Sequence, residues 1–329
     1  MKQGIVVVGS LNMDLVVNVE RLPHEGQTLL AEAMSEIPGG KGANQAAAIG
    51  KLGAPVAMIG KVGDDPHGLR LLDSLRESGV DTGAVASSSC PTGLAVITVD
   101  ADGRNHIVVV PGANKELAPD DIERFRRTIE QCEIVVLQLE IPLETVKHTL
   151  RLAKALGKTT VLNPAPAQRL DDEMLRTVDF LIPNEHELQE LAGIRSLEQD
   201  AIRQASEHFL NKGVKALIVT LGEEGCCCAD HSGIRHYPAY RVEAVDTTAA
   251  GDSFIGGFVT GYLAHKDPDP AIRLALKAAA LTVTKRGAQS SLPSYEEVEN
   301  SPFFRSRTIK ETGYEAFIWG YNGDGDTVR

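Results

Sequence analysis

The sequence predicts a doubly wound α/β fold, in which a mainly parallel sheet is flanked by helices on both faces. Six short runs rich in β-branched residues alternate along the chain with amphipathic helical patterns. This alternation is typical of a parallel sheet, because parallel strands need helical crossover connections. The predicted strands are 5–8, 56–59, 134–139, 159–162, 180–182 and 216–220. The predicted helices are 43–52, 68–78, 120–130, 144–156, 185–192, 199–212 and 271–284.

Two insertions, residues 15–38 and 93–110, have a different pattern, because apolar and polar residues alternate in them with a period of two. In the second insertion, an Ala-Asp-Gly turn separates two alternating runs, which is a strong β-hairpin signal. We therefore expect four antiparallel strands, from about 13–38 and 92–111, to form one small sheet. Beside an α/β crevice, such a sheet would act as a lid.

A lone small sheet is marginally stable, so one face of the lid should be covered by substrate or by a partner subunit. We expect the apolar face to pair with a second subunit, which would make the protein a homodimer. The residues assigned to this face are Val17, Val19, Leu29, Ala95, Ile97 and Val108.

The 329 residues are 43% apolar, enough for one large domain or two small ones with a substantial core. The net charge is −12 with both signs mixed, and no basic run suggests a nucleic-acid partner. An acidic protein that binds a polyanion needs local positive elements, such as Lys41, backbone amides or a divalent cation. No apolar run approaches ~18 residues, so we expect no membrane span.

The five cysteines are odd in number and irregularly spaced, which favours a reducing, cytoplasmic location over a disulfide framework. The N-terminus is predicted to be a strand and lacks the features of a signal peptide. Cys226, Cys227 and Cys228 stand near His231 and His236, which could suggest zinc. Adjacent strand residues point to opposite faces, so three in a row cannot converge on one ion. We interpret the segment as a strand packed on both sides.

The segment Asp246-Thr-Thr-Ala-Ala-Gly-Asp-Ser253 precedes an apolar helical run. A glycine at a helix start lets the backbone approach a ligand, and the free N–H groups there favour an anion. A carboxylate in that position would repel a phosphate, but it could take a proton from a hydroxyl that attacks one. The segment indicates a phosphoryl-transfer site with Asp252 as its base, and the alternative is a solvated N-capping aspartate.

A second motif, Gly39-Gly-Lys-Gly-Ala-Asn44, precedes another helical run. Its glycines permit close backbone approach, Lys41 supplies a positive charge, and Asn44 offers both a donor and an acceptor. These features suit a polyhydroxylated or anionic ligand, and the alternative is a flexible strand–helix connector. The P-loop, dinucleotide and protein-kinase motifs are absent from the sequence.

Polar residues also follow several of the predicted strands, where a doubly wound sheet binds its ligands. One such residue alone is more often a helix cap or a turn residue, but several together indicate a shared site. They are Asn12, Asp14, Glu140, Asn163, Asn184, Glu187, Thr220 and Gly222.

Together these motifs resemble the ribokinase-like family of sugar and nucleoside kinases. Gly39-Gly-Lys-Gly-Ala-Asn-Gln-Ala46 resembles the N-terminal signature of the family, and Asp246-Thr-Thr-Ala-Ala-Gly-Asp252 resembles its C-terminal signature. Further segments in the right order are Asn12-Met-Asp14, Asn163-Pro-Ala-Pro-Ala167, Pro183-Asn-Glu185 and Lys285-Arg-Gly-Ala-Gln-Ser-Ser-Leu-Pro293.

The resemblance covers about residues 3–300 and implies one kinase domain over 1–302. Residues 303–329 are left as a tail without an assigned role, in which Trp319 and Tyr321 favour some packing. Two features depart from the family pattern. Leu276 stands where relatives often place a polar residue near the adenine, and the triple cysteine is unusual beside a nucleotide strand.

The family implies ATP-dependent phosphorylation of the 5-hydroxyl of D-ribose. Asp252 would be the general base, and the backbone amides of Ala249, Ala250 and Gly251 would form an anion hole. The implied sugar pocket is Asn12, Asp14, Gly40, Lys41, Gly42, Asn44, Glu140 and Asp252. The implied ATP site is Asn184, Thr220, Gly222, Gly225 and Gly251.

The family also implies two cations. Mg²⁺ would accompany ATP, held largely through water and phosphate, with Glu187 acting indirectly. An activating K⁺ would order the loop that shapes the anion hole. Its implied ligands are the Asp246 carboxylate, the carbonyls of Thr248, Thr282, Lys285 and Gly287, and the Ser291 hydroxyl.

Two alternatives remain open at this point. The same reaction could act on deoxyribose, fructose, another keto-sugar or a nucleoside, although Asn12 and Asp14 favour the vicinal hydroxyls of ribose. A non-catalytic sugar-sensing protein is the second alternative. The presence of Asp252, Gly251 and Lys41 argues against it, because a binding module does not need a base.

Overall fold

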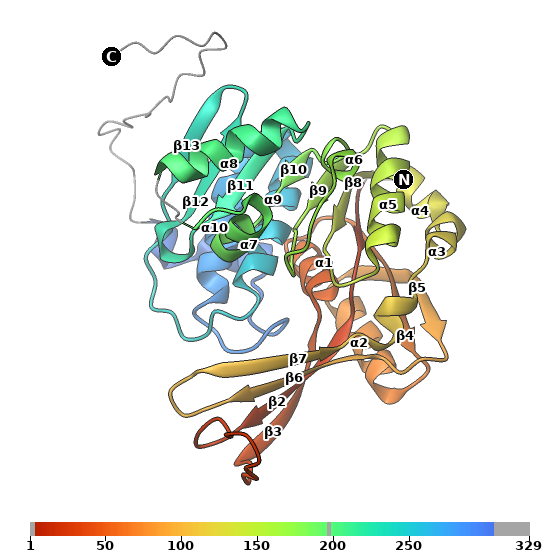
Figure 1. Cartoon of the computed structure of the whole chain (residues 1–329), viewed down its shortest axis with the longest axis vertical. Helices are drawn as coiled ribbons and strands as arrows, with labels where there is room; N and C mark the ends of the chain where they lie inside the picture. The colour runs from red at the N-terminus through yellow and green to blue at the C-terminus, as the bar shows by residue number, and fades with distance from the viewer. Residues whose placement is uncertain (1–3, 196–198, 306–329) are drawn as a thin grey trace.

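The computed structural model describes residues 4–195 and 199–305. It contains a nine-stranded sheet and a separate four-stranded sheet (Figure 1). The order of the large sheet is β13-β12-β11-β10-β9-β8-β1-β4-β5. Its strands are β1 (Gly4–Val8), β4 (Val56–Gly63), β5 (Val80–Ser88), β8 (Cys132–Leu137), β9 (Thr159–Leu162), β10 (Phe180–Leu181), β11 (Ala216–Thr220), β12 (Cys226–Asp230) and β13 (Gly233–Tyr237).

The sheet is parallel from β5 to β11, and at one edge the pairs β11–β12 and β12–β13 are antiparallel. Strand β1 pairs in parallel with β4 on one side and with β8 on the other. The chain therefore builds outward from β1 in both directions, which creates a topological switch point. Ligands of doubly wound sheets bind beyond the carboxyl ends of the strands at such a point.

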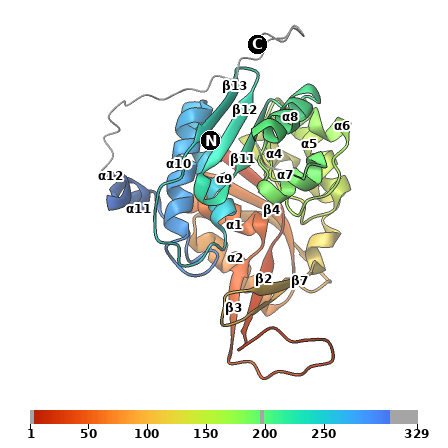
Figure 2. The same ribbon diagram turned by 60° about the vertical axis from the view of Figure 1, so that its left-hand side comes forward.

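Helices cover both faces of the sheet, and Figure 2 shows the sheet between the two layers. One layer contains α1 (Lys41–Lys51), α2 (Pro66–Glu77), α9 (Ala250–His265) and α10 (Pro268–Thr282), with α11 (Tyr295–Asn300) and α12 (Pro302–Arg305) beside it. The other contains α3 (Pro119–Arg124), α4 (Arg126–Glu130), α5 (Leu143–Ala155), α6 (Asp172–Leu175), α7 (Glu185–Ala192) and α8 (Gln199–Asn211). Two short 3₁₀ helices are η1 (Gly112–Glu116) and η2 (Gly222–Glu224).

The two layers rest on two separate hydrophobic clusters, because successive strand residues point to opposite faces. In β1, Ile5 and Val7 join the cluster under α1, α9 and α10. Val6 and Val8 join the cluster under α5 and α8. Since both faces of β1 are buried, the strand appears in the sequence as a continuous apolar run. The predicted doubly wound fold is confirmed.

The predicted small sheet is present with four strands in the order β3-β2-β6-β7, but its central pair is parallel, whereas we expected all four strands to be antiparallel. Its strands are β2 (Asn12–Asn18), β3 (Ala33–Gly39), β6 (Gly93–Val99) and β7 (Asn105–Val110). Two antiparallel hairpins, β2–β3 and β6–β7, are joined by parallel pairing of β2 with β6. The central pair is parallel because Asn12 and Gly93 begin opposite each other, and both strands leave the main domain in the same direction.

The assignment of one apolar lid face was wrong. Cross-strand partners share a face of a sheet. Ala95 is opposite Asp14 and therefore lies on the face of that carboxylate, whereas Val108 is opposite Val96 and lies on the other face. Ile97 shares the first face and Val17 the second, while Val19 and Leu29 fall outside the four strands. Both faces of the lid thus carry apolar residues. The alternation within one strand does not show which face it shares with another strand, because that depends on the pairing register.

Other differences occur at edges and breaks. Strand β5 was not predicted, because as an edge strand it buries few of its residues. The predicted helix 120–130 is divided at Phe125 into α3 and α4. At the start of the predicted tail, the Phe304 ring packs on Tyr240 with 4.7 Å between centroids. Trp319 and Tyr321 lie outside the described residues. Among the described helices, none is both long and apolar enough to span a bilayer.

Candidate active site

A cleft of about 210 Å³ opens beyond the carboxyl ends of β9, β10 and β11, beside the starts of α1 and α9. Its walls come from α1, α7, the segments after β9, β10 and β11, and the start of α9. The lining residues are Lys41, Asn163, Ile182, Asn184, Glu187, Thr220, Thr247, Ala249, Ala250, Gly251, Asp252 and Ile255.

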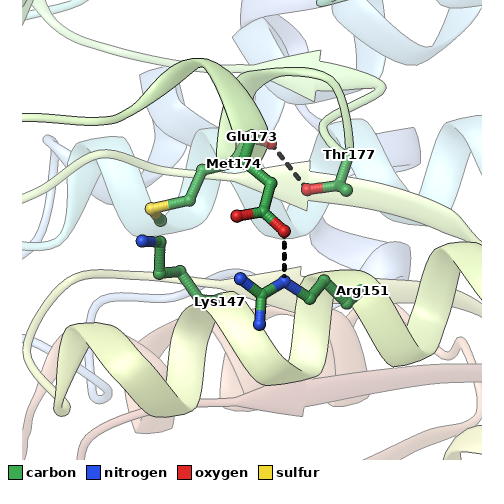
Figure 3. A pocket seen from close by; sticks show the side chains of 5 residues that line it. All are labelled: Lys147, Arg151, Glu173, Met174 and Thr177. Atoms are coloured by element: carbon green, nitrogen blue, oxygen red, sulfur yellow. Dashed lines mark hydrogen bonds and ion pairs between the residues drawn. The ribbon is translucent and has the colours of Figure 1, made fainter.

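A second, smaller hollow lies between α5 and α6 and has no comparable chemistry (Figure 3). Arg151 donates Nε to Glu173 Oε1 at 2.7 Å, and Lys147 is paired with Asp171. Because each basic group is already neutralised by a carboxylate, this hollow offers no unpaired charge to a ligand. The first cleft is therefore the candidate site.

The start of α9 presents backbone donors to the cleft. Ala249 has a φ of 60°, a left-handed conformation that is rare for a residue with a side chain. The N–H of Ala250, one of the three amides predicted for the anion hole, instead donates to the Thr247 carbonyl at 3.2 Å. The N–H groups of Gly251 and Asp252 have no partner within residues 4–195 and 199–305. Free donors at a helix N-terminus bind anions.

Asp252 lies at this helix start and is buried. Its Oδ2 accepts Asn44 Nδ2 and its Oδ1 accepts Gln45 Nε2, both at 3.0 Å. Burial raises the pKa of the Asp252 carboxyl, while Lys41 and the two amide donors oppose the rise. The carboxylate is thus fixed in place next to the unpaired N–H groups at the start of α9.

Lys41, the first residue of α1, supplies positive charge to the same cleft. Burial disfavours its ammonium, but Asp252, Glu140 and Glu187 outweigh burial and raise the pKa of Lys41. Its backbone N–H also donates to Glu140 Oε2 at 3.1 Å, and Ser10 Oγ donates to the same oxygen at 2.5 Å. Glu140 therefore links the end of β1 to the start of α1.

The glycines flanking Lys41 allow α1 to start against β1. Gly40 has a φ of 88°, and a Cβ there would lie 2.6 Å from Asn12 N. A Cβ on Gly42 would lie 2.6 Å from Ser10 N. Since both neighbours are backbone atoms, larger residues would push the helix away from the strand. The glycines of this motif are thus required for close packing of α1 against the segment that follows β1.

Asp14 and Asn12 occupy the base of the lid. No described residue donates a hydrogen bond to the Asp14 carboxylate, and burial with nearby Glu140 and Asp252 raises the pKa of Asp14 to about 7. Asn12 is 2% exposed, and its Oδ1 accepts Asn114 Nδ2 at 2.7 Å. This contact leaves the Nδ2 group of Asn12 as an available donor.

On the opposite wall, Asn184 and Glu187 form a reciprocal capping box at the start of α7. Asn184 N donates to Glu187 Oε2 at 2.9 Å, and Glu187 N donates to Asn184 Oδ1 at 2.9 Å. Burial raises the pKa of Glu187, against the opposing effects of Asn184 and Lys41. Thr220 forms a bridge with Asn184 at the end of β11, and Gly222 and Gly225 follow it at positive φ.

The predicted cation ligands come from two segments that the structure brings together. Asp246 Oδ2 accepts Gly287 N at 2.9 Å, and its Oδ1 accepts Thr248 N at 2.9 Å. These donors outweigh burial and lower the pKa of Asp246, so the group is an anion. The Thr282 carbonyl accepts a hydrogen bond from Lys285 N at 3.1 Å. Ser291, a few residues further along the chain, is buried. Asp246 is thus an anion held by a backbone hydrogen bond against the 282–291 segment.

Sequence reasoning missed Gln45, Asn114 and Thr247. Gln45 adjoins the glycine motif, but as the start of a helical run it gave no signal of its own. Asn114 and Asn12 are 102 positions apart in the sequence, so only the folded structure shows that they are in contact. Within the described ranges, no group of three His, Cys, Asp or Glu side chains is arranged to hold a metal. Cys226, Cys228 and Leu276 lie in the hydrophobic core.

Known proteins resemble the chain over most of its length. Residues 2–295 match the family described as pfkB family carbohydrate kinase. A deoxyribokinase of Salmonella typhi is 43% identical over 295 residues, covering 89% of this chain and 96% of the relative. A ribokinase of Staphylococcus aureus is 40% identical over 301 residues, covering 91% and 99%.

Solved structures give the same result. Ribokinase of Thermotoga maritima superposes with a TM-score of 0.83 at 39% identity, covering 91% of this chain and 98% of that one. Arabidopsis thaliana ribokinase complexed with ribose and ATP superposes with a TM-score of 0.84 at 34% identity, with the same coverage.

Proposed function

The chain belongs to the pfkB family of carbohydrate kinases, and we propose that it transfers the γ-phosphoryl group of ATP to the 5-hydroxyl of D-ribose. The single observation that carries the proposal is the buried Asp252, fixed by two amides beside unpaired N–H groups at the start of α9. A base next to an anion hole fits phosphoryl transfer from ATP to a hydroxyl, and the products are D-ribose 5-phosphate and ADP.

In the proposed reaction, Asp252 takes the proton of the sugar hydroxyl as its oxygen attacks the γ-phosphorus. The bond from that phosphorus to the bridging oxygen of ADP breaks. The N–H groups of Gly251 and Asp252 stabilise the charge on the moving phosphoryl group, and Lys41 adds a positive charge on the same side. Mg²⁺ bound with ATP would neutralise phosphate charge, with Glu187 reaching it through water.

The sugar pocket is proposed to lie between the lid and α1. The Asn44 Oδ1 atom is buried without a hydrogen-bond partner in the described structure, Asp14 lacks donors, and the Nδ2 group of Asn12 is available. A polyhydroxylated ligand offers both donors and acceptors and would satisfy all three. A buried polar group left unpaired is costly, so a sugar that lacks one hydroxyl should bind less well. This argument favours ribose.

Deoxyribose is the second candidate substrate, because the Salmonella typhi deoxyribokinase is 43% identical to this chain. The same base and anion hole would act on the 5-hydroxyl of either sugar. The two sugars differ by one hydroxyl, and their discrimination would depend on whether that hydroxyl is needed to pair Asn12 or Asp14.

We also propose that K⁺ activates the enzyme through the Asp246 segment and the 282–291 loop. The ion would fix the loop that precedes α9 and so preorganise the anion hole, without entering the chemistry. The hydrogen bonds from Gly287 and Thr248 to Asp246 support this assignment. The five free cysteines are consistent with the cytoplasmic location that we propose.

A steady-state assay of ADP release tests these proposals on D-ribose, 2-deoxyribose, fructose and a nucleoside, each with and without K⁺. We expect the highest kcat/KM on ribose, with stimulation by K⁺. A higher kcat/KM on deoxyribose would replace the substrate and keep the mechanism, and no effect of K⁺ would remove the cation site.

The base is tested by Asp252→Asn, which keeps the size of the side chain and one of its two amide contacts but cannot accept the proton. We expect kcat to fall by about 10³-fold while calorimetry still detects ribose binding. Wild-type protein that binds ribose but shows no turnover would instead support a sugar-sensing role.

A further inference from the structure

A chain of buried amides leads to the Asp252 carboxylate from the centre of the sheet. Gln45 and Gln138 are both 0% exposed. Gln45 donates Nε2 to Asp252 Oδ1 at 3.0 Å, and Gln138 donates Nε2 to Gln45 Oε1 at 2.5 Å. Because neither side chain reaches the surface, neither can bind substrate, and water cannot replace either contact.

The orientation of the Gln45 amide is determined by its partners. Its oxygen accepts from Gln138, so its two N–H groups must face the other way. One N–H binds Asp252, and the other binds Asn163 Oδ1 at 3.3 Å. Asn163 is fixed in turn, because its Nδ2 donates to the Ile182 carbonyl at 3.0 Å. A reversed Gln45 amide would place its oxygen against the carboxylate, where two acceptors repel.

We propose that Gln45 is a positioning residue that holds the Asp252 carboxylate in the orientation for proton transfer, and that Gln138 acts through Gln45 by orienting its amide. The proposal rests on the proposed role of Asp252 as the base. Asn44 binds one carboxylate oxygen and Gln45 the other, so the pair blocks rotation of the carboxylate. Small displacements of a catalytic group cost a large part of the rate.

The same contact affects protonation, because a donor stabilises the ionised carboxylate. The charged groups that face Asp252 are Lys41 on α1, Asp14 on β2, Glu140 after β8 and Glu187 on α7. Replacing Gln45 by methionine leaves all four in place and keeps the length of the side chain. A change in the titration of Asp252 would therefore report the lost amide.

The test compares wild type with Gln45→Met, Gln138→Met and the double variant. For Gln45→Met we expect kcat on ribose to fall 10- to 100-fold with KM changed by less than about 3-fold. The acid limb of kcat against pH should move up by about one unit. Gln138→Met should have a smaller effect in the same direction and no further effect when Gln45 is already methionine.

A direct ¹³C NMR titration of the Asp252 carboxyl, assigned with Asp252→Asn, gives a readout independent of turnover. Its pKa should rise by about one unit in Gln45→Met. The control is Thr160→Val. Thr160 is buried and hydrogen-bonded to Asp179 at the amino ends of β9 and β10, so this variant should be less stable but should leave the pKa of Asp252 unchanged.

An unchanged kcat and an unchanged Asp252 pKa in Gln45→Met would overturn the proposal. So would a double variant in which Gln138→Met lowers kcat as much as it does in the wild-type background. A wild type without turnover on any sugar would refute the kinase function instead. In that case the NMR shift would still decide whether Gln45 holds Asp252.

Discussion

At the scale of single residues, Asp14 and Asp252 are both buried carboxylates, but their hydrogen bonds differ. Asp252 accepts two amide donors, whereas no described residue donates to Asp14. Burial therefore acts on Asp14 without opposition from a donor, together with repulsion from Glu140 and Asp252, and its pKa rises to about 7. Ionised Asp14 therefore destabilises the folded protein, and a ligand hydroxyl that donates a hydrogen bond to it would offset this effect.

This destabilisation gives a pH-dependent stability with a definite sign. The pKa of Asp14 is raised from 3.8 to about 7, so between these values the folded state binds more protons than the unfolded state. The free energy of unfolding should then fall as pH rises through this window. Asp14→Asn removes this contribution. The free energy of unfolding of the variant, measured relative to wild type, should therefore increase by about 2–3 kcal/mol when the pH is raised from about 5 to about 8.

Urea unfolding at the two pH values measures this difference without ligand. Ribose should also bind wild type more tightly at about pH 8 than at pH 6, because the ionised carboxylate accepts hydroxyl hydrogen bonds. A constant difference in stability between Asp14→Asn and wild type would contradict the raised pKa.

At the scale of elements, the starts of α1 and α9 both carry a glycine as the second helical residue, but the two glycines have different roles. A Cβ on Gly42 would lie 2.6 Å from Ser10 N, whereas a Cβ on Gly251 meets no atom within 4 Å. Gly42 is required for packing of the helix against β1. Gly251 lines the cleft, and the space beside it is open to a ligand.

The matched pair Gly251→Ala and Gly42→Ala separates packing from function. Gly251→Ala should keep its stability or gain up to about 1 kcal/mol, because alanine favours helix. Its kcat/KM should fall about 100-fold, because the methyl group occupies the space proposed for the phosphoryl group. For Gly42→Ala, the free energy of unfolding should fall by about 1–3 kcal/mol, because the backbone around Ser10 must move to admit the methyl group.

Denaturant unfolding and steady-state kinetics on both variants check these values. Full activity in Gly251→Ala would show that the phosphoryl group does not approach this part of α9.

At the scale of the whole molecule, the lid holds much of the exposed apolar surface. Of the ten large hydrophobic side chains exposed in the described structure, five belong to its strands and a sixth to the β2–β3 loop. The five are Met34, Ile107, Val108, Val109 and Val110, and the sixth is Leu30. On a monomer, the four exposed apolar side chains of the edge strand β7 would favour association. We propose that the lids of two copies pair and bury them, which would also stabilise the cover over the sugar pocket.

Val108→Asp tests the dimer, since Val108 is 63% exposed and lies on the lid face opposite Asp14. We expect light scattering at micromolar concentration to show a dimer for wild type and a monomer for this variant, with a raised KM for ribose. The control is Phe303→Asp on α12, which is 49% exposed and far from the lid (Figure 2). A monomeric wild type would refute the proposal.

The sequence by itself determined the fold class and most elements. Helix 185–192 and the strands at 159–162 and 216–220 agree with the structure, because buried strands and amphipathic helices depend on the order of neighbouring residues. It also pointed to Asp252, Lys41, Asn184 and Thr220, which line the cleft, since turn glycines and strand ends are local signals.

Only the tertiary structure decided which side chains support the site. Gln45 and Asp252 are 207 positions apart, and Asn114 and Asn12 are 102 apart, so no local pattern relates them. The lid faces and the edge strand β5 were likewise decided by pairing between distant segments. Hydrogen bonds between buried polar groups form wherever the packed layers bring the groups together, and that meeting is a property of the whole fold.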